Sequence, residues 1–168
     1  MTALFISPTY LKKKSIIDGH TDDDKLVQFI ETAQDIHVQN YLGTNLYNRL
    51  QALVIATELD APGNELYSTL LKTYVKPMLA WYAQAEYIPF SAYTVANGGV
   101  FRHRSDASDA VPYEEIAGLA TRAQDKASFY TNRLIEYMNT NGSKYPEYNS
   151  STDDMYPDKE VNNFGWVV

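Results

Sequence analysis

The segment from Asp22 to Tyr47 constrains the fold most, because it has the pattern of two consecutive helices with their own start and stop signals. Thr21 is placed to cap the first helix, and the three aspartates that follow put negative charge at the positive end of the helix dipole. Gly43 stands where a helix C-terminus favours positive φ, and Thr44 is suited to cap the next helix. The segment therefore predicts a helical packing module.

Apolar residues in this segment recur at the three- and four-residue steps of an amphipathic helix. The predicted inward stripe consists of Leu26, Phe29, Ile30, Ala33, Ile36, His37, Asn40 and Tyr41. Similar patterns predict helices from Pro8 to about Lys14, from Asn45 to about Leu59, from Asn64 to about Ala85, and from Val111 to about Asn139. Pro77 lies inside the predicted helix from Asn64 to about Ala85 and should kink or split it, because proline lacks a backbone donor.

Two segments lack a helical pattern. Between Pro89 and Val111, strand-favouring residues flank the turn Asn97-Gly98-Gly99, which predicts a small β-hairpin or an extended arm. From Ser143 onward the chain is polar and acidic with scattered aromatic residues. We therefore expect a mainly α-helical bundle of four to five helices over residues 1–148, with a loop or hairpin inserted at 89–111, and an extended C-terminal tail over 149–168.

Composition excludes several classes of protein. The 168 residues suit one domain, and the absence of cysteine excludes disulfide scaffolds, thiolate catalysis and cysteine-ligated zinc. A net charge of −7 argues against general nucleic-acid binding. Because the N-terminus lacks the order of a signal peptide and no apolar run approaches the ~18 residues of a membrane span, we expect a soluble protein without a membrane partner. The 14 tyrosines suit cores and interfaces alike.

Candidate chemistry is sparse. His20 lies near three aspartates, but a loop histidine before a helix cap is the simpler interpretation of that pattern. His37 lies on the apolar stripe without a metal-ligand partner at helical spacing, which favours a core or interface histidine. Arg102, His103 and Arg104 concentrate cationic donors that suit an anion or a partner subunit. Since no nucleophile motif, phosphate loop or dinucleotide fingerprint is present, the sequence predicts no active site, no cofactor and no metal site.

Three stretches resemble the head-to-tail connector, or adaptor, proteins of tailed bacteriophages. They are the short helix after SPTYL, the acidic-capped helix DDDKLVQFIETAQDIHVQNYLG and the helix NLYNRLQAL. The family pattern of apolar residues before a glycine is met by Leu26, Phe29, Ile30, Ala33, His37, Tyr41 and Gly43. Further along, GGVFRHRSDAS and EYMNTNGSKYPEY resemble the ring-shaped neck proteins of crAss-like phages.

The resemblance implies a structural virion protein that is made in the host cytoplasm and forms a ring, typically twelve-fold, in the phage neck. Such a ring contacts the portal protein and other neck or tail proteins, and genome DNA passes through it without specific binding. Independently, the hairpin and the tail suit contacts between ring subunits; the candidate partner-binding residues are Gly98, Gly99, Phe101, Arg102, His103, Arg104, Tyr156, Phe164 and Trp166. The residues alone leave open a soluble cytosolic helical module that binds or regulates another protein.

Overall fold

The computed structural model describes residues 3–91, 93–96, 99–102, 112–150 and 155–161, and it confirms a mainly α-helical bundle. Its helices and strands are α1 (Pro8–Lys14), α2 (Asp23–Ala33), α3 (Gln39–Ile55), α4 (Glu65–Thr69), α5 (Lys76–Ser91), β1 (Tyr93–Ala96), β2 (Gly99–Arg102), α6 (Tyr113–Asn141) and α7 (Pro146–Asn149). Two π-helical segments, Gln34–Val38 and Leu70–Val75, join α2 to α3 and α4 to α5, and a 3₁₀ turn, Gly142–Lys144, precedes α7.

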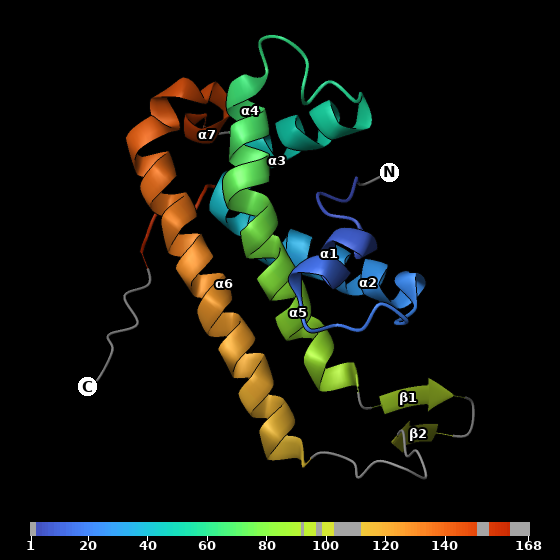
Figure 1. The fold of residues 1–168 in the computed structure, drawn as a ribbon. Helices are drawn as coiled ribbons and strands as arrows, with labels where there is room; N and C mark the ends of the chain where they lie inside the picture. Colours follow the sequence, from blue (N-terminus) through green and yellow to red (C-terminus); the bar gives the residue numbers. More distant parts are fainter. Residues whose placement is uncertain (1–2, 92, 97–98, 103–111, 151–154, 162–168) are drawn as a thin grey trace.

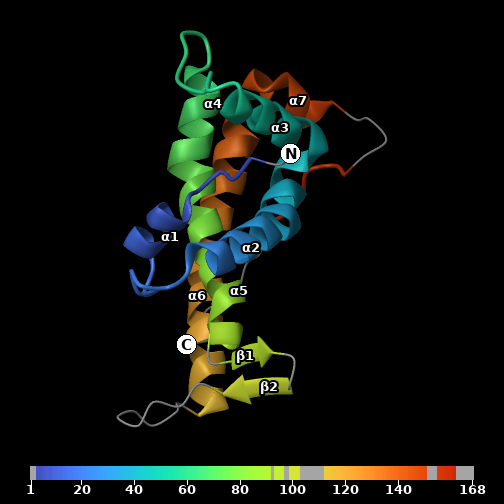
Figure 2. The ribbon, with the colours of Figure 1, turned by 90° about the vertical axis from the view of Figure 1, so that its right-hand side faces the viewer.

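The long helices α5 and α6 run side by side, and the N-terminal helices pack across one face of α5 (Figures 1 and 2). The main core gathers apolar side chains from α1, α2, α3, α5, α6 and α7. A second, smaller cluster lies between α5 and α6 and consists of Ala85, Ile88, Ile116 and Ala123. Ala123 and Ala127 are buried, and small side chains of this kind on α6 allow a neighbouring helix to approach closely.

The start of α2 and its break before α3 follow the local sequence closely. Asp22, rather than Thr21, is the N-cap, because its carboxylate accepts a hydrogen bond from the Asp24 N–H at 3.0 Å. At Gly43 the backbone adopts φ 72° and ψ 157°, which interrupts the helical geometry inside α3. The positive φ expected at Gly43 is confirmed.

The inward stripe of α2 does not continue through the π-helical segment. Ile36, predicted to point inward, is 56% exposed, whereas Gln34 and Val38 are buried. A π-helical turn contains more residues than an α-helical turn, so it rotates the residues that follow it relative to an α-helical stripe. The prediction for Ile36 is wrong for that reason.

Pro77 and Pro89 both lie in α5, and their effects on the helix differ from those predicted. Upstream of Pro77 the helix widens into the π-helical segment, where the Lys76 N–H bonds to the Leu71 carbonyl five residues back. Pro89 lies inside α5, which continues to Ser91, so the non-helical segment begins later than predicted. Proline lacks the N–H that would bond four residues back and its ring crowds that carbonyl, and α5 ends within one turn of Pro89, at Ser91.

Thr57 occupies a position usually filled by glycine. It has φ 57°, and α3 ends in a Schellman motif in which the Thr57 N–H bonds to Val54 O at 3.1 Å and the Glu58 N–H bonds to Leu53 O at 2.9 Å. A β-branched residue is disfavoured in this left-handed conformation.

Replacing Thr57 with glycine is therefore expected to raise the free energy of unfolding by roughly 0.5–1 kcal/mol. Glycine relieves the strain of the left-handed conformation, and this gain exceeds the cost of the greater conformational entropy that glycine has in the unfolded chain. Urea unfolding would measure the change, with Thr121→Gly as the control, because Thr121 lies within α6 and glycine there should destabilise. Lower stability of Thr57→Gly would show that the motif does not strain threonine.

The region around Gly142 belongs to the core, although the sequence there has no helical period. Tyr145 and Tyr148 are buried, and Tyr148 packs on Gly142, where an added Cβ would lie 3.1 Å from the ring. The 3₁₀ turn and α7 bring both tyrosines back under the end of the bundle. Their burial supports a helical domain that extends to about Tyr148.

The described part of the tail, residues 155–161, has neither helix nor strand, and we call it the strap. The strap lies on the bend at Gly43, where the Thr44 N–H bonds to Met155 O at 3.0 Å and the Asp158 N–H bonds to Asn40 O at 2.9 Å. Val161 packs against the main core. The strap of a tail that its sequence suits to contacts between ring subunits thus folds back on its own bundle.

Candidate functional site

The predicted partner-binding residues fall in two separate places. Gly99, Phe101 and Arg102 lie in β2, which pairs antiparallel with β1 so that Phe101 is opposite Thr94 and Arg102 is opposite Tyr93. Tyr156 lies in the strap, is 52% exposed, and has the Lys159 ammonium 5.2 Å from its ring centre. Gly98, His103, Arg104, Phe164 and Trp166 lie outside the described residues.

The hairpin extends from the end of α5 that is far from α3, α4 and α7 (Figure 1). On this part of the molecule α6 packs mainly against α5, and Leu119 of α6 is exposed. An isolated two-stranded hairpin is marginally stable in water. Its position makes β1 and β2 available to another molecule.

An aromatic groove lies at the base of the hairpin and was not predicted from the sequence. It has a volume of about 590 Å³ and is lined by His20, Thr21, Asp22, Lys25, Gln28, Phe29, Tyr87, Phe90, Ser91 and Tyr93. The Phe29 ring centre lies 5.4 Å from that of Tyr87 and 5.7 Å from that of Phe90. Phe90 is 61% exposed, which is unusual for a large apolar ring beside other aromatic residues.

The sequence contained a signal for this groove. Tyr87 and Phe90 are three residues apart, which places their rings on one side of the end of α5, and Tyr93 follows at the start of β1. Their meeting with Phe29 depends on the packing of α2 against α5, which local spacing does not reveal.

His37 joins three helical segments and lies in a packed environment. Its ring stacks on Tyr82 with centroids 3.8 Å apart, and its Nε2 lies 3.1 Å from Glu86 Oε1. The Tyr82 hydroxyl lies 3.2 Å from Thr131 Oγ1 on α6. Within the described part of the chain, no group of three or more His, Asp or Glu side chains could hold a metal ion.

Tyrosines at the opposite end of the bundle form a hydrogen-bonded cluster. The Tyr145 hydroxyl donates to Leu66 O at 3.0 Å and lies 2.9 Å from the Tyr137 hydroxyl, and the Tyr137 ring stacks on Tyr74. Burial, together with the hydrogen bond to Tyr137, raises the pKa of Tyr145 above its ordinary value. Burial likewise raises the pKa of Tyr148 to about 12. These tyrosines stabilise the fold.

Residues 38–157 match the model of DUF6712, a family of unknown function. The match covers more than half of the chain. This protein is a member of the DUF6712 family. No match was found among curated proteins or among solved structures.

The DUF6712 segment contains both Gly43 and the part of the strap that lies on it. It begins just before Gly43 and ends at Pro157, whose ring would lie 2.7 Å from a Cβ at Gly43. It also contains β1, β2 and the α5 side of the aromatic groove, whereas Phe29 and the rest of α2 precede it. None of the described helices of this DUF6712 protein has the length and apolar content needed to cross a membrane.

Proposed function

We propose that this DUF6712 protein is a structural virion subunit that forms a ring in the neck of a tailed phage and joins the portal vertex to the tail. The main observation in its support is the pairing of a projecting hairpin with an exposed aromatic groove at its base. Ring subunits need two different surfaces, because each subunit contacts one neighbour with one surface and the next neighbour with the other.

The chemistry of the groove suits a protein partner. Phe29, Tyr87, Phe90 and Tyr93 provide aromatic area, and Asp22 and Lys25 at its edge provide charges of both signs. Aromatic residues at the centre and polar residues at the rim are typical of protein interfaces. The exposed side of Phe90 is the part that a neighbouring subunit or the portal protein would cover.

The closed core suits a subunit that folds before it assembles. The main cluster buries apolar side chains from both ends of the described chain within one bundle. The net charge of −7 would give a ring wall that repels the phosphate backbone, so that genome DNA could move through without sticking. The protein would therefore be folded but weakly associated until a template is present.

Native mass spectrometry of the full chain, alone and with the portal protein of the same phage, tests this proposal. We expect monomers or small oligomers alone and a closed ring with the portal protein. Replacing Phe90 with aspartate should lower the yield of ring by about tenfold, since loss of one aromatic anchor typically weakens an interface by more than ~1 kcal/mol. Phe129→Asp is the control, because Phe129 is similarly exposed but lies on α6, outside the groove.

The outcomes separate the two candidate functions. Equal loss of ring with Phe90→Asp and Phe129→Asp would contradict the groove as the contact surface. A lasting monomer that ignores the portal protein would overturn the ring proposal and favour a helical module that binds or regulates another protein. Circular dichroism of both variants would confirm that each is folded.

A further inference from the structure

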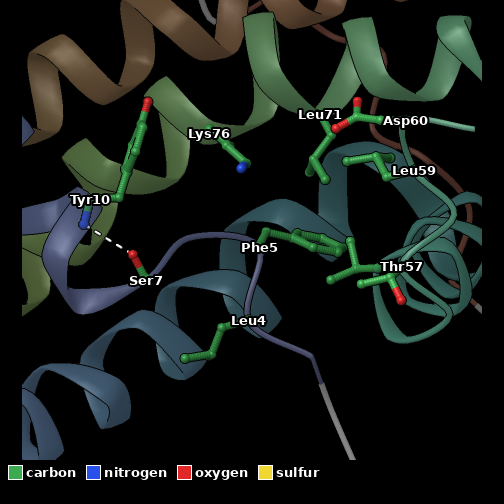
Figure 3. A pocket seen from close by; sticks show the side chains of 10 residues that line it. Leu4, Phe5, Ser7, Tyr10, Thr57, Leu59, Asp60, Leu71 and Lys76 are labelled. Carbon is green, nitrogen blue, oxygen red and sulfur yellow. Dashed lines mark hydrogen bonds between the residues drawn. The ribbon is translucent and has the colours of Figure 1, made fainter.

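A second cavity lies far from the hairpin, between the N-terminal segment, the end of α3 and the start of α5. Its volume is about 370 Å³, within the ~300–1,000 Å³ typical of small-molecule sites. Figure 3 shows the side chains that line it: Leu4, Phe5, Ser7, Tyr10, Val54, Thr57, Leu59, Asp60, Leu71 and Lys76. Half of these residues have aliphatic or phenyl side chains, so the wall is about equally apolar and polar.

Lys76 is the cation of this cavity, and its charge is not neutralised. Its ammonium points into the space between Tyr10 and Leu71 (Figure 3). It forms no hydrogen bond or ion pair with another described residue. Its Nζ lies 5.9 Å from the centroid of the Tyr10 ring, which is a cation–π distance. Burial, and then the neighbouring Lys72, lower the pKa of Lys76, which means that the site disfavours the ammonium as it stands.

The nearby carboxylate, Asp60, attracts the Lys76 ammonium and opposes the lowering of its pKa, but the ion pair of Asp60 is with Lys72. Asp60 forms an ion pair with Lys72 and accepts a hydrogen bond from the Ser68 hydroxyl at 2.6 Å. Those contacts lower the pKa of Asp60, the Lys72 contact most of all. Two ammonium groups thus face one carboxylate, a local positive excess in a chain of net charge −7.

We propose that this cavity binds a small monocarboxylate with an apolar body, whose carboxylate pairs with Lys76 and whose hydrocarbon lies against Phe5 and Leu71. A single negative charge balances the local excess of one positive charge. A second negative charge on the ligand would meet Asp60 at the wall of the cavity. The cavity shares no lining residue with the aromatic groove, so this proposal does not rest on the proposed role in a virion.

Isothermal titration calorimetry of the full chain with 3-phenylpropionate tests the proposal, with 3-phenylpropanol as the neutral ligand of the same shape. We expect saturable binding of the acid, at least about tenfold tighter than the alcohol, since a charge-assisted hydrogen bond contributes more than ~1.4 kcal/mol. Lys76→Met should remove that preference. The matched control Lys126→Met should retain it, because Lys126 lies on α6 and does not line the cavity.

Proton uptake on ligand binding tests the same proposal, and it can be measured on the unaltered protein without a variant. A bound carboxylate favours the ammonium and raises the pKa of Lys76, so binding should be accompanied by proton uptake at alkaline pH, where part of the free Lys76 is neutral. Titrations in buffers of different ionisation enthalpy would measure the uptake. Equal affinities for acid and alcohol, no saturable binding at millimolar ligand, or binding without proton uptake would each overturn the proposal.

Discussion

Replacing Gly43 with alanine is expected to lower the free energy of unfolding by about 3–4 kcal/mol. Two independent costs add at this position. The backbone has φ 72° and ψ 157°, a region that is almost restricted to glycine and costs other residues ~1–3 kcal/mol. In addition, the new Cβ would lie 2.7 Å from Pro157 Cδ and 3.2 Å from Met155 O, so the strap must move.

Gly63→Ala is the matched control for backbone conformation. Gly63 also has positive φ, 94°, but among the described residues no atom lies within 4 Å of the position its Cβ would take. We expect Gly63→Ala to cost about 1–2 kcal/mol, the conformational term alone. Urea unfolding of the two variants would measure the difference, and equal costs would contradict a close contact between Gly43 and the strap.

Truncation after Ser150 completes a double-mutant cycle for this contact. Without the strap, Gly43→Ala should cost only the conformational term, so the two changes should couple by about 1–2 kcal/mol. Truncation alone should also lower stability, because it removes the hydrogen bonds to Thr44 N–H and Asn40 O and exposes the core beside Val161. An unchanged melting temperature after truncation would mean that the strap leaves the bundle in solution.

Replacing Gln34 with leucine is expected to lower the free energy of unfolding by about 2–3 kcal/mol, although leucine keeps much of the volume. Gln34 is 0% exposed. Its Oε1 accepts a hydrogen bond from the Phe5 N–H at 2.8 Å, and its Nε2 donates to Ala3 O and to the Tyr47 hydroxyl, both at 3.0 Å. Leucine would leave the buried Phe5 N–H without a partner, and such a group carries its full desolvation cost.

Gln28→Leu controls for the chemical change, because Gln28 lies on α2 and is exposed. We expect it to change the free energy of unfolding by less than ~0.5 kcal/mol. Thermal melting followed by circular dichroism would compare the two variants. If both are equally stable, the amide of Gln34 does not hold the N-terminal segment on the bundle.

Much of the helical framework could be predicted because its signals are local. α1 lies where Ser7 and Pro8 predict a start, and α6 ends within two residues of the predicted position. The Ser7 hydroxyl accepts a hydrogen bond from the Tyr10 N–H at 3.1 Å, which is the cap that the sequence indicates. Caps, proline positions and apolar spacing act over about one helical turn, so they can be recognised in the chain itself.

The partner-binding surfaces could be predicted only in part. The aromatic residues near Pro89 draw attention to the hairpin, but the groove beneath it needs Phe29, which the sequence places on an inward stripe. The cavity around Lys76 had no sequence signal, because its lining comes from three separated parts of the chain. Such sites depend on how helices pack, and packing does not follow from the periodicity of any one helix.

The sequence by itself determined the helical class and the glycine conformation at residue 43. Only the tertiary structure decided that Gln34 is inside and Ile36 outside, that Tyr145 and Tyr148 belong to the core, and that Pro157 covers Gly43. The physical reason is the distance over which each interaction acts along the chain. A cap or a positive φ is set by neighbours within a few residues, whereas the burial of an amide and the seating of the strap join residues that are far apart in sequence.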